Sequence, residues 1–211
     1  NSRMNEKPLA IISGGTGYVG RAIRIALENS GWNVISLGRH AVVDSSTFQC
    51  DVTNLRQVEE VIRKITKQYG DISACIHAAT PSILNKPLLE MDVESFEDSL
   101  LVAVRGAFLL AKATVPHMKA GASFIGITSK LIEPEIVLPP TGSYVTAKYG
   151  LRGFLRTLAS EARAKGIRVY AVAPGFMPGG LNDGVSPAMI DFLASRSGAG
   201  TTTVEEVAAL V

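Results

Sequence analysis

Two residues four positions apart could form a proton-transfer pair. Tyr144 and Lys148 lie in the stretch GSYVTAKYG, residues 142–150. On a helix, positions i and i+4 share one face, about one turn apart. A phenol has a pKa of about 10, too high for efficient proton transfer at neutral pH, and a neighbouring ammonium lowers it. Such a pair is suited to protonating a carbonyl oxygen that receives a hydride, or to taking the proton back in the reverse reaction.

The same spacing also arises in an ordinary helix whose tyrosine simply packs on a neighbour. Tyr149 is an internal comparison, because the position four residues after it is Gly153 and offers no ammonium. Whether Tyr144 is an acid or a packing residue therefore depends on what the rest of the fold places beside it.

The elements that would position this pair alternate between strands and helices. Near-continuous apolar runs of strand length are typical of parallel strands covered on both faces, and helical periods fall between them. This order predicts an α/β fold, a single Rossmann-like, doubly wound parallel sheet with helices on both faces. The expected strands are 8–14, 33–38, 47–52, 72–79, 123–129 and 168–175, and the expected helices are 18–29, 54–69, 91–119, 143–165, 187–196 and 203–211. The expected helix N-caps are Thr53, Asp92, and Ser143 or Thr141.

One domain, residues 8–211, accounts for this pattern without a linker or repeat. Residues 1–7 are polar and are expected to be disordered or derived from a tag. Residues 176–200 combine glycines with apolar side chains, which favours a mobile substrate lid followed by a short helix.

The first strand runs into a glycine-rich loop, SGGTGYVGRAI, residues 13–23. Glycines let the chain turn tightly and bring backbone N–H groups against a pyrophosphate, and the following helix N-terminus favours its negative charge. A strand before the loop and an amphipathic helix after it are the context that this motif requires. The loop therefore predicts a dinucleotide site, with Gly14, Thr16, Gly17, Tyr18, Val19 and Gly20 as cofactor-binding residues.

The end of the second strand indicates which dinucleotide binds. The sequence there is SLGRH, in which Arg39 stands where an acid would contact the ribose hydroxyls of NAD. A guanidinium offers a charged, bidentate fork to the 2′-phosphate of NADP. NADP is therefore favoured over NAD, although an arginine in a solvated surface loop would look the same.

The glycine loop, Asp51-Val52 and the Tyr144-x-x-x-Lys148 pair follow one another at separations that resemble the short-chain dehydrogenase/reductase family, over residues 8–211. The layout is mostly that of the classical members. The spacing Gly14-x-x-Gly17-x-x-Gly20 is similar to that of the extended members, which keeps an epimerase or dehydratase acting on nucleotide sugars as a minor reading.

The resemblance implies roles for further residues. It identifies Ser129 as the residue that orients the substrate carbonyl toward Tyr144, and Lys148 as a ligand of the cofactor ribose. Asp51 and Val52 would hold the adenine ring, and Pro174 and Gly175 would lie against the nicotinamide. HAAT, residues 77–80, stands where the family usually has N-N-A-G, so His77, Ala78 and Ala79 would belong to the cofactor pocket rather than supply a base.

Three departures from the family pattern stand out. Ala103 occupies the place of an asparagine that usually bonds the kinked central helix and helps to hold a relay water. Ser129 lies fifteen residues before Tyr144, about two more than is common in the family, and the intervening residues 130–142 are proline-rich and apolar and are expected to line the substrate pocket. The family's last strand is missing after the helix expected at 203–211.

Composition narrows the partners. Hydrophobic residues make up 46% of the 211 residues and the net charge is +2, which indicates a globular protein and gives no basis for binding nucleic acid. The longest apolar run is too short to span a bilayer, so no membrane is expected. Cys50 and Cys75 lie in apolar runs without metal-ligand spacing, which predicts buried free thiols, no metal site and a reducing cytoplasm.

The sequence therefore predicts an NADP-dependent oxidoreductase acting on a fairly apolar carbonyl or secondary alcohol, free or held on a carrier. Its catalytic residues would be Ser129, Tyr144 and Lys148, and the family resemblance implies a homodimer or homotetramer formed through the helices at 91–119 and 143–165. The alternative is a catalytically weak NADP-binding sensor or scaffold, which Ala103 favours.

Overall fold

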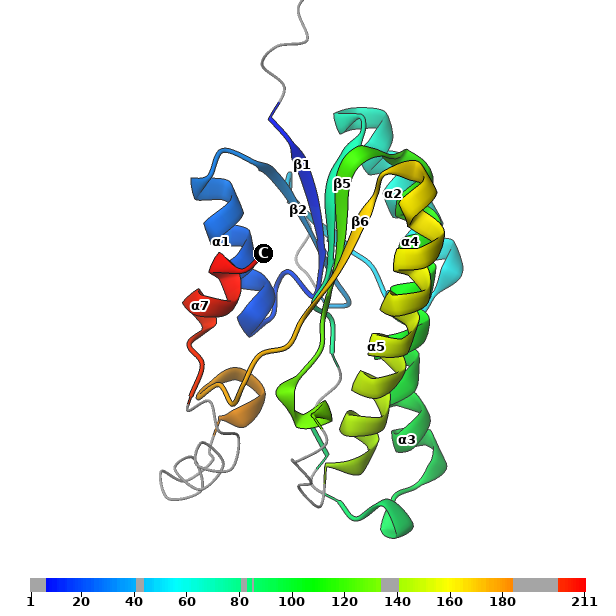
Figure 1. Ribbon diagram of the computed structural model, residues 1–211, viewed down its shortest axis with the longest axis vertical. Helices are drawn as coiled ribbons and strands as arrows, with labels where there is room; N and C mark the ends of the chain where they lie inside the picture. Colours follow the sequence, from blue (N-terminus) through cyan, green and yellow to red (C-terminus); the bar gives the residue numbers. More distant parts are fainter. Residues whose placement is uncertain (1–6, 41–43, 81–82, 85, 134–140, 184–200) are drawn as a thin grey trace, which may run out of the picture.

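The apolar runs form the six strands of one parallel sheet, with the order β3-β2-β1-β4-β5-β6 (Figure 1). The computed structural model describes residues 7–40, 44–80, 83–84, 86–133, 141–183 and 201–211. The strands are β1 Leu9–Ser13, β2 Asn33–Gly38, β3 Thr47–Gln49, β4 Ile72–His77, β5 Met118–Ile127 and β6 Arg168–Val172.

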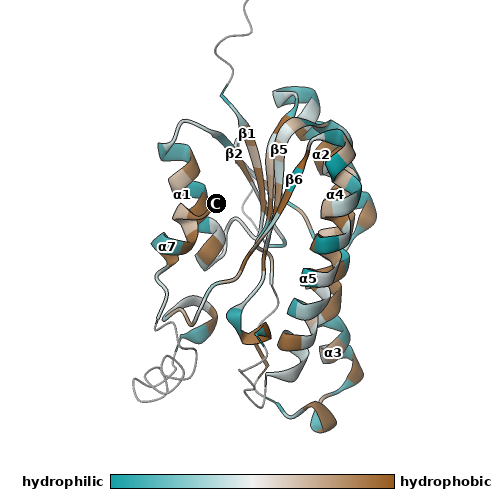
Figure 2. Ribbon diagram, viewed as in Figure 1, coloured by the Kyte–Doolittle hydropathy of each residue, from teal (hydrophilic) through white to brown (hydrophobic). Residues whose placement is uncertain are grey.

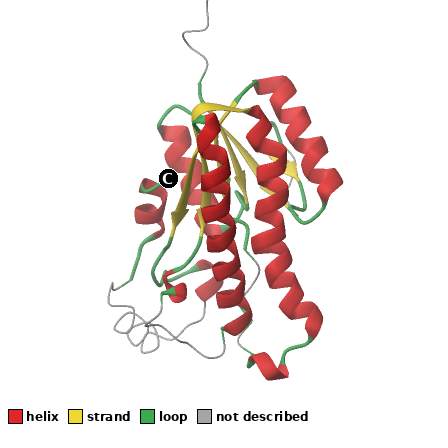
Figure 3. Cartoon of the chain, turned by 45° about the vertical axis from the view of Figure 1, so that its right-hand side comes forward, coloured by secondary structure: helices red, strands yellow, loops and turns green. Residues whose placement is uncertain are grey.

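Helices lie on both faces of this sheet, as predicted (Figures 1 and 3). On one face lie α1 Tyr18–Asn29 and α7 Val204–Ala209, and on the other lie α2 Leu55–Tyr69, α3 Val93–Leu100, α4 Gly106–Thr114 and α5 Gly142–Ala162. Leu101–Arg105 is a π-helical turn, and short 3₁₀ turns are formed by Leu88–Glu90, Val115–His117, Lys130–Ile132, Arg163–Lys165 and Gly180–Asn182.

Both faces of β1, β2 and β4 are buried, which explains why their sequences do not alternate between apolar and polar residues. Ile11 and Phe124 pack into the cluster beneath α2, α4 and α5. Ile12 and Ile125 point the other way, into the cluster beneath α1 and α7. Figure 2 shows the apolar residues concentrated along the central strands, between the two helical layers.

The chain reverses its direction across the sheet between β3 and β4. Strands β2 and β3 lie on one side of β1. Strand β4 pairs with β1 on its other side, where Ser13 lies opposite His77. Ligands of doubly wound sheets bind in the crevice outside the carboxyl ends of the strands at such a switch point. The ends of β1 and β4 are therefore where a site is expected.

The longest apolar helical stretch, Val93–His117, combines α3, the π-helical turn, α4 and a 3₁₀ turn. By length and composition alone it could cross a membrane, with a mean hydropathy of 1.4, but 44% of that window is buried. The stretch packs against α2, α5 and β4. It is therefore accounted for as a core helix of the α/β layer.

The ends of some helices and strands differ from the prediction because they depend on pairing with distant strands. The predicted helix 91–119 ends at His117, because Met118 already pairs with Ile72 as the first residue of β5. That strand consequently begins five residues earlier than the predicted 123. The predicted strand 47–52 is reduced to β3.

Of the predicted N-caps, Asp92 is confirmed, since its carboxylate accepts from the Ser95 N–H at 2.8 Å. Thr53 is wrong: Asn54 caps α2 by accepting from the Gln57 N–H, while Thr53 bonds to Asp51. Helix α7 matches the predicted 203–211, and the predicted helix 187–196 lies outside the described residues. Within the described chain the sheet ends at β6.

Candidate active site

The glycine loop between β1 and α1 leaves no room for side chains. Gly14 has φ +72°, and a Cβ there would lie 2.7 Å from the amide nitrogen of Ala79. A Cβ on Gly20 would collide with the carbonyl oxygen of Gly14. These contacts are with backbone atoms, which cannot rotate away. The loop can therefore adopt this compact shape only because these positions are glycine.

The amino end of α1 is suited to an anion. Its N-cap is Gly17, no side chain caps the helix, and the first turn carries no acid. Thr16, Gly17 and Tyr18 are exposed, whereas Val19 packs into the core and offers only its backbone. Backbone N–H groups and the helix dipole at such an end attract phosphate. The loop geometry thus fits the pyrophosphate of a dinucleotide.

Tyr18 also connects this loop to the segment after β6. Its hydroxyl donates to the carbonyl oxygen of Pro178 at 3.2 Å, and Gly179 and Gly180 approach its ring. The described part of the predicted lid, residues 176–183, is therefore anchored on the first residue of α1. Residues 184–200 lie outside the described chain.

Arg39 follows β2 directly and is exposed, without an ion pair to any residue that the structure describes. Val52 is buried against Gly106. The Asp51 carboxylate accepts from the N–H and the hydroxyl of Thr53, at 2.9 and 2.8 Å. Asp51 and Val52 thus lie in a turn held by local hydrogen bonds, beside the carboxyl ends of β2 and β3.

Ser129, Tyr144 and Lys148 come together at the carboxyl end of β5. Ser129 follows that strand and is 7% exposed, and its hydroxyl accepts from the Leu131 N–H at 3.2 Å. Tyr144 and Lys148 lie on the first turns of α5, with the Lys148 Nζ 5.4 Å from the centre of the Tyr144 ring. The structure thus places a serine, a tyrosine and a lysine from two elements around one point.

Burial sets the ionisation of this group. Burial raises the pKa of Tyr144, and a hydrogen bond with the Ser129 hydroxyl opposes that rise without cancelling it. The expected lowering of the Tyr144 pKa by Lys148 is therefore wrong for this state, because desolvation of the phenolate dominates. Tyr144 carries its proton at neutral pH, as a proton donor must.

Lys148 is 3% exposed, and its Nζ donates to the carbonyl oxygen of Ile127 at 2.8 Å. No carboxylate within the described residues pairs with it. Burial lowers its pKa to about 8. The ammonium is thus close to titration, which suits a group that helps to move protons.

His77 and the two alanines after it lie opposite the glycine loop. His77 is fully buried, and its Nδ1 is 2.8 Å from the Oγ of Ser13, the last residue of β1. The N–H of Ala78 donates to the Ser13 carbonyl oxygen at 3.0 Å, and Ala79 borders Gly14. This segment forms one wall of the loop.

Pro174 and Gly175 lie beside Ser129 after β6, since the N–H of Lys130 donates to the Pro174 carbonyl oxygen at 2.9 Å. Ile132, near the start of the segment expected to line the substrate pocket, is buried, whereas residues 134–140 lie outside the described chain.

A π-helical turn lies at the place where the family's central helix is kinked, although the residue there is Ala103. Leu101–Arg105 is the π-helical turn, closed by a hydrogen bond from the Gly106 N–H to the Leu101 carbonyl oxygen. Ala103 is fully buried within it. The sequence shows that the asparagine side chain is absent at Ala103, but it does not predict that the π-helical turn forms without it.

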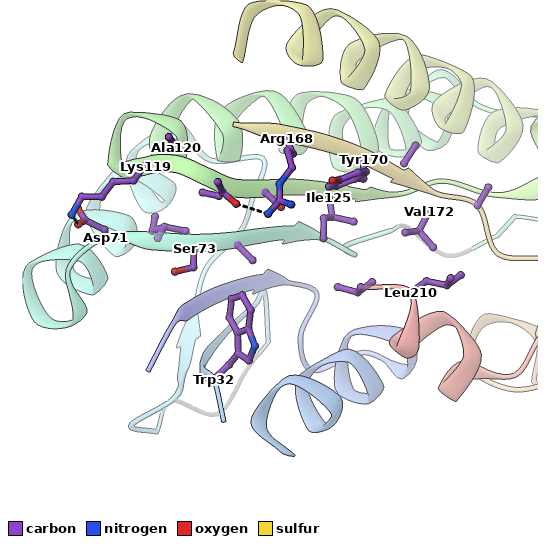
Figure 4. A pocket seen from close by; sticks show the side chains of 18 residues that line it. Trp32, Asp71, Ser73, Lys119, Ala120, Ile125, Arg168, Tyr170, Val172 and Leu210 are labelled. Carbon is purple, nitrogen blue, oxygen red and sulfur yellow. Dashed lines mark hydrogen bonds and ion pairs between the residues drawn. The ribbon is translucent and has the colours of Figure 1, made fainter. Parts of the chain in front are cut away.

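A cavity of about 800 Å³ lies elsewhere, along β4, β5 and β6 (Figure 4). Trp32, Tyr170 and Leu210 are among the residues that surround it, and none of the three catalytic candidates lines it. It is therefore separate from the chemistry. Cys50 and Cys75 are buried free thiols, as predicted. In the part of the chain that the structure describes, no three His, Cys, Asp or Glu side chains gather as metal ligands.

A parallel sheet with a glycine loop at its switch point is typical of dinucleotide-binding α/β proteins. Comparison with known proteins gives the family: residues 21–211 match the family model described as enoyl-(acyl carrier protein) reductase. The chain belongs to the short-chain dehydrogenase/reductase family, whose members are NAD(P)-dependent oxidoreductases.

Its relatives are distant. The 3-oxoacyl-[acyl-carrier-protein] reductase FabG of Staphylococcus aureus is 25% identical over 191 residues, 84% of this chain and 77% of that protein. The 2,5-dichloro-2,5-cyclohexadiene-1,4-diol dehydrogenase of Sphingobium indicum is 28% identical over 185 residues, 82% of this chain and 74% of that protein. Among solved structures, the ligand-free aldohexose dehydrogenase of Thermoplasma acidophilum superposes with a TM-score of 0.83 at 26% identity, over 97% of this chain and 85% of that one.

Proposed function

We propose that residues 8–211 form one NADP-dependent oxidoreductase domain that reduces a carbonyl, or oxidises a secondary alcohol, through Ser129, Tyr144 and Lys148. The observation that carries this proposal is the convergence of these three side chains at the carboxyl edge of the sheet that also holds the glycine loop. When bound there, the cofactor supplies or accepts the hydride. The chain's own residues then handle binding, orientation and the proton.

The proton chemistry follows from the surroundings of each side chain. The Ser129 hydroxyl donates to the substrate oxygen and holds it near Tyr144. Tyr144, kept protonated by burial, gives its proton to the alkoxide that forms as hydride arrives, and takes it back in the oxidation direction. Lys148 stabilises the resulting phenolate by its charge.

The choice of NADP rests on Arg39. Its exposed guanidinium, at the carboxyl end of β2 and without an ion pair among the described residues, is available to a 2′-phosphate. The pyrophosphate is held by the glycine loop, through Gly14, Thr16, Gly17, Tyr18, Val19 and Gly20. The adenine contacts Asp51 and Val52, and the adenosine side of the pocket is formed by His77, Ala78 and Ala79. The nicotinamide lies against Pro174 and Gly175.

A fairly apolar carbonyl is the proposed substrate, and one held on a carrier is compatible with relatives named as acyl-carrier-protein reductases. We place the protein in the cytoplasm as a homodimer or homotetramer. The outer surfaces of α4 and α5 support self-association, since Phe108 and Tyr149 are 49% and 47% exposed and Phe108 meets Phe154 edge-on at 6.5 Å.

The test is a pair of tyrosine variants. Tyr144→Phe should lower NADPH-linked turnover of a carbonyl panel by roughly 10²–10⁴-fold, because it removes the proton donor. Tyr149→Phe, five residues away, is the matched control: it removes only an exposed hydroxyl, leaves the ring on the proposed self-association surface in place, and should keep full turnover. Equal turnover of both variants would rule out the proposed acid.

A catalytically weak sensor or scaffold is the second candidate, favoured by the apolar Ala103 in the π-helical turn. It predicts that NADPH raises the melting temperature while no compound of the panel is reduced, and that Tyr144→Phe changes neither result.

A further inference from the structure

One fully buried polar group has no role in the chemistry described so far. The Nδ1 of His77 meets the Ser13 hydroxyl at 2.8 Å, but its Nε2 has no hydrogen-bond partner within the described chain. A buried polar group left without a partner costs about 1–3 kcal/mol. Such a group in a native fold calls for a physical reason.

The surroundings of that nitrogen are the π-helical turn Leu101–Arg105. A Cβ on Gly106 would lie 3.2 Å from the His77 Cε1, so the ring edge faces the end of the turn. The carbonyl groups of Val102 and Ala103 are close enough to interact with the imidazole, although neither completes a hydrogen bond with Nε2. A π-type turn widens the backbone by one residue, so a carbonyl group loses its α-helical partner there. The Nε2 edge of the imidazole thus faces backbone carbonyl groups of the turn.

The same place adjoins Lys148. His77 is paired in register with Gly126 of β5, and the next residue, Ile127, supplies the carbonyl oxygen that accepts from Lys148 Nζ. Burial lowers the pKa of His77 to about 4, and the positive charge of Lys148 is the second-largest cause of this shift. The imidazole is therefore neutral at neutral pH, with one ring nitrogen carrying a proton.

Resting on the proposed function, we propose that His77 is a positioning residue of that site: Ser13 donates to its Nδ1, and its Nε2–H holds the carbonyl side of the turn Leu101–Arg105 beside Lys148. Ala103 has only a methyl group in the turn and cannot do this itself. The arrangement links the end of β1, where the glycine loop starts, to the helix that packs on α5.

The tautomer of His77 tests the arrangement without any turnover. Long-range ¹H–¹⁵N spectra of the imidazoles at pH 7 should show a neutral Nε2–H tautomer for His77, identified as the signal that His77→Gln lacks. His40 and His117, the other two histidines, are exposed and provide the comparison. A Nδ1–H tautomer or an imidazolium at pH 7 would overturn the proposal. Ser13→Ala should weaken the Nε2–H preference, because it removes the donor to Nδ1.

Two amide variants test the functional part. Gln places an N–H near the position of Nε2, whereas Asn reaches only the position of Nδ1 and the Ser13 side. His77→Gln should keep kcat within about threefold, and His77→Asn should lower it about tenfold or more, because a misplaced Lys148 weakens proton transfer. Because His77 is also proposed to lie on the adenosine side of the cofactor pocket, kcat is measured at saturating NADPH, so that a change in the Kd for NADPH does not enter the comparison. Equal kcat values, or a better Asn variant, would overturn the assignment.

The outcomes separate the two proposals. Full turnover by Tyr144→Phe refutes the proposed function, and the tautomer still decides the place of the His77 proton. If neither His77 variant folds, as judged by circular dichroism, the His77 signal is identified as the one that remains in both His40→Gln and His117→Gln, and its tautomer decides alone.

Discussion

The two halves of the candidate site are built in opposite ways. The glycine loop between β1 and α1 offers backbone N–H groups, and its shape depends on the absence of side chains at Gly14 and Gly20. Helix α5 offers side chains, and the properties of Tyr144 and Lys148 are set by burial. The shape of the glycine loop is determined by excluded volume. The ionisation of Tyr144 and Lys148 in α5 is determined by the cost of removing charge from water.

This contrast predicts different failures. A backbone site does not titrate, but it cannot accept an added methyl group where the neighbours are backbone atoms. A buried ionisable site accepts apolar replacements, and such replacements remove a desolvation cost while they remove function. Substitutions in the loop should therefore abolish binding, and substitutions in α5 should separate turnover from stability.

The largest effect on cofactor binding is expected in the loop. Gly20→Ala places a Cβ against the carbonyl oxygen of Gly14 and 2.8 Å from the Gly15 Cα, so the loop must change shape. The Kd for NADPH, measured by isothermal titration calorimetry, should rise by 100-fold or more, on the order of 3 kcal/mol. Binding within threefold of the unsubstituted protein would show that the glycine loop is not the pyrophosphate site.

In α5, Lys148→Met should lower turnover on the order of 100-fold and yet stabilise the fold. The pKa of Lys148 is lowered from 10.5 to about 8 by burial. Below pH 8 the ammonium is charged in both states, and its charge costs free energy in the folded state, where it is removed from water. That shift corresponds to about 3 kcal/mol, and the lost bond to Ile127 offsets about 1, which leaves a gain of about 2 kcal/mol at pH 7.

The sign of the pH dependence gives the control. Between pH 8 and 10.5 the unfolded state binds the extra proton, so the unsubstituted protein gains stability as pH rises and the advantage of Lys148→Met disappears. Urea unfolding at pH 7 and pH 10 measures this. A constant difference between the two proteins at both pH values would mean that burial of the charge has no cost.

Sequence reasoning succeeded where the determinants are local. Helix α1 has the predicted bounds of 18–29, because a strand, a glycine turn and an amphipathic period follow one another directly. The parallel sheet and the family were also predicted correctly. The direction of the Tyr144 pKa shift was not, because it depends on burial by segments distant in the sequence.

The same limit explains the histidine. Position 77 read as the end of an apolar strand, and nothing local reveals that its ring would face a π-helical turn some 25 residues later, between β4 and β5. The apolar run up to His77 was a signal that the imidazole would be buried. Its partners depend on the register of β1 and β4 and on the packing of the kinked helix, which are tertiary properties.

A smaller effect is expected at Arg39, whose role is a contact rather than a shape. Arg39→Ala should reduce the preference for NADPH over NADH about tenfold or more, since a charge-assisted bond to the 2′-phosphate contributes about 1.5–3 kcal/mol. Arg63→Ala, on the exposed side of α2, is the matched control and should leave the ratio unchanged. An unchanged ratio in Arg39→Ala would leave the selection of NADP to other residues.

The smallest effect compares two glycines within α5 itself. A Cβ on Gly153 would meet nothing within 4 Å, whereas a Cβ on Gly150 would lie 2.8 Å from the Val104 Cγ2 in the π-helical turn. Gly153→Ala should therefore stabilise the protein by about 0.5–1 kcal/mol, the usual gain of alanine over glycine in a helix, without changing turnover.

Gly150→Ala carries the same gain in helix propensity but must displace Val104 or α5. Its melting temperature should fall below that of Gly153→Ala, and kcat should fall with it, because the displaced elements are those that place Lys148 and the turn side by side. Equal melting temperatures and equal kcat values for the two variants would show that the packing of α5 on the π-helical turn is loose enough to absorb a methyl group. An added methyl group would then be excluded only in the glycine loop. The two halves of the site would differ more in their tolerance of added volume than the burial of both halves suggests.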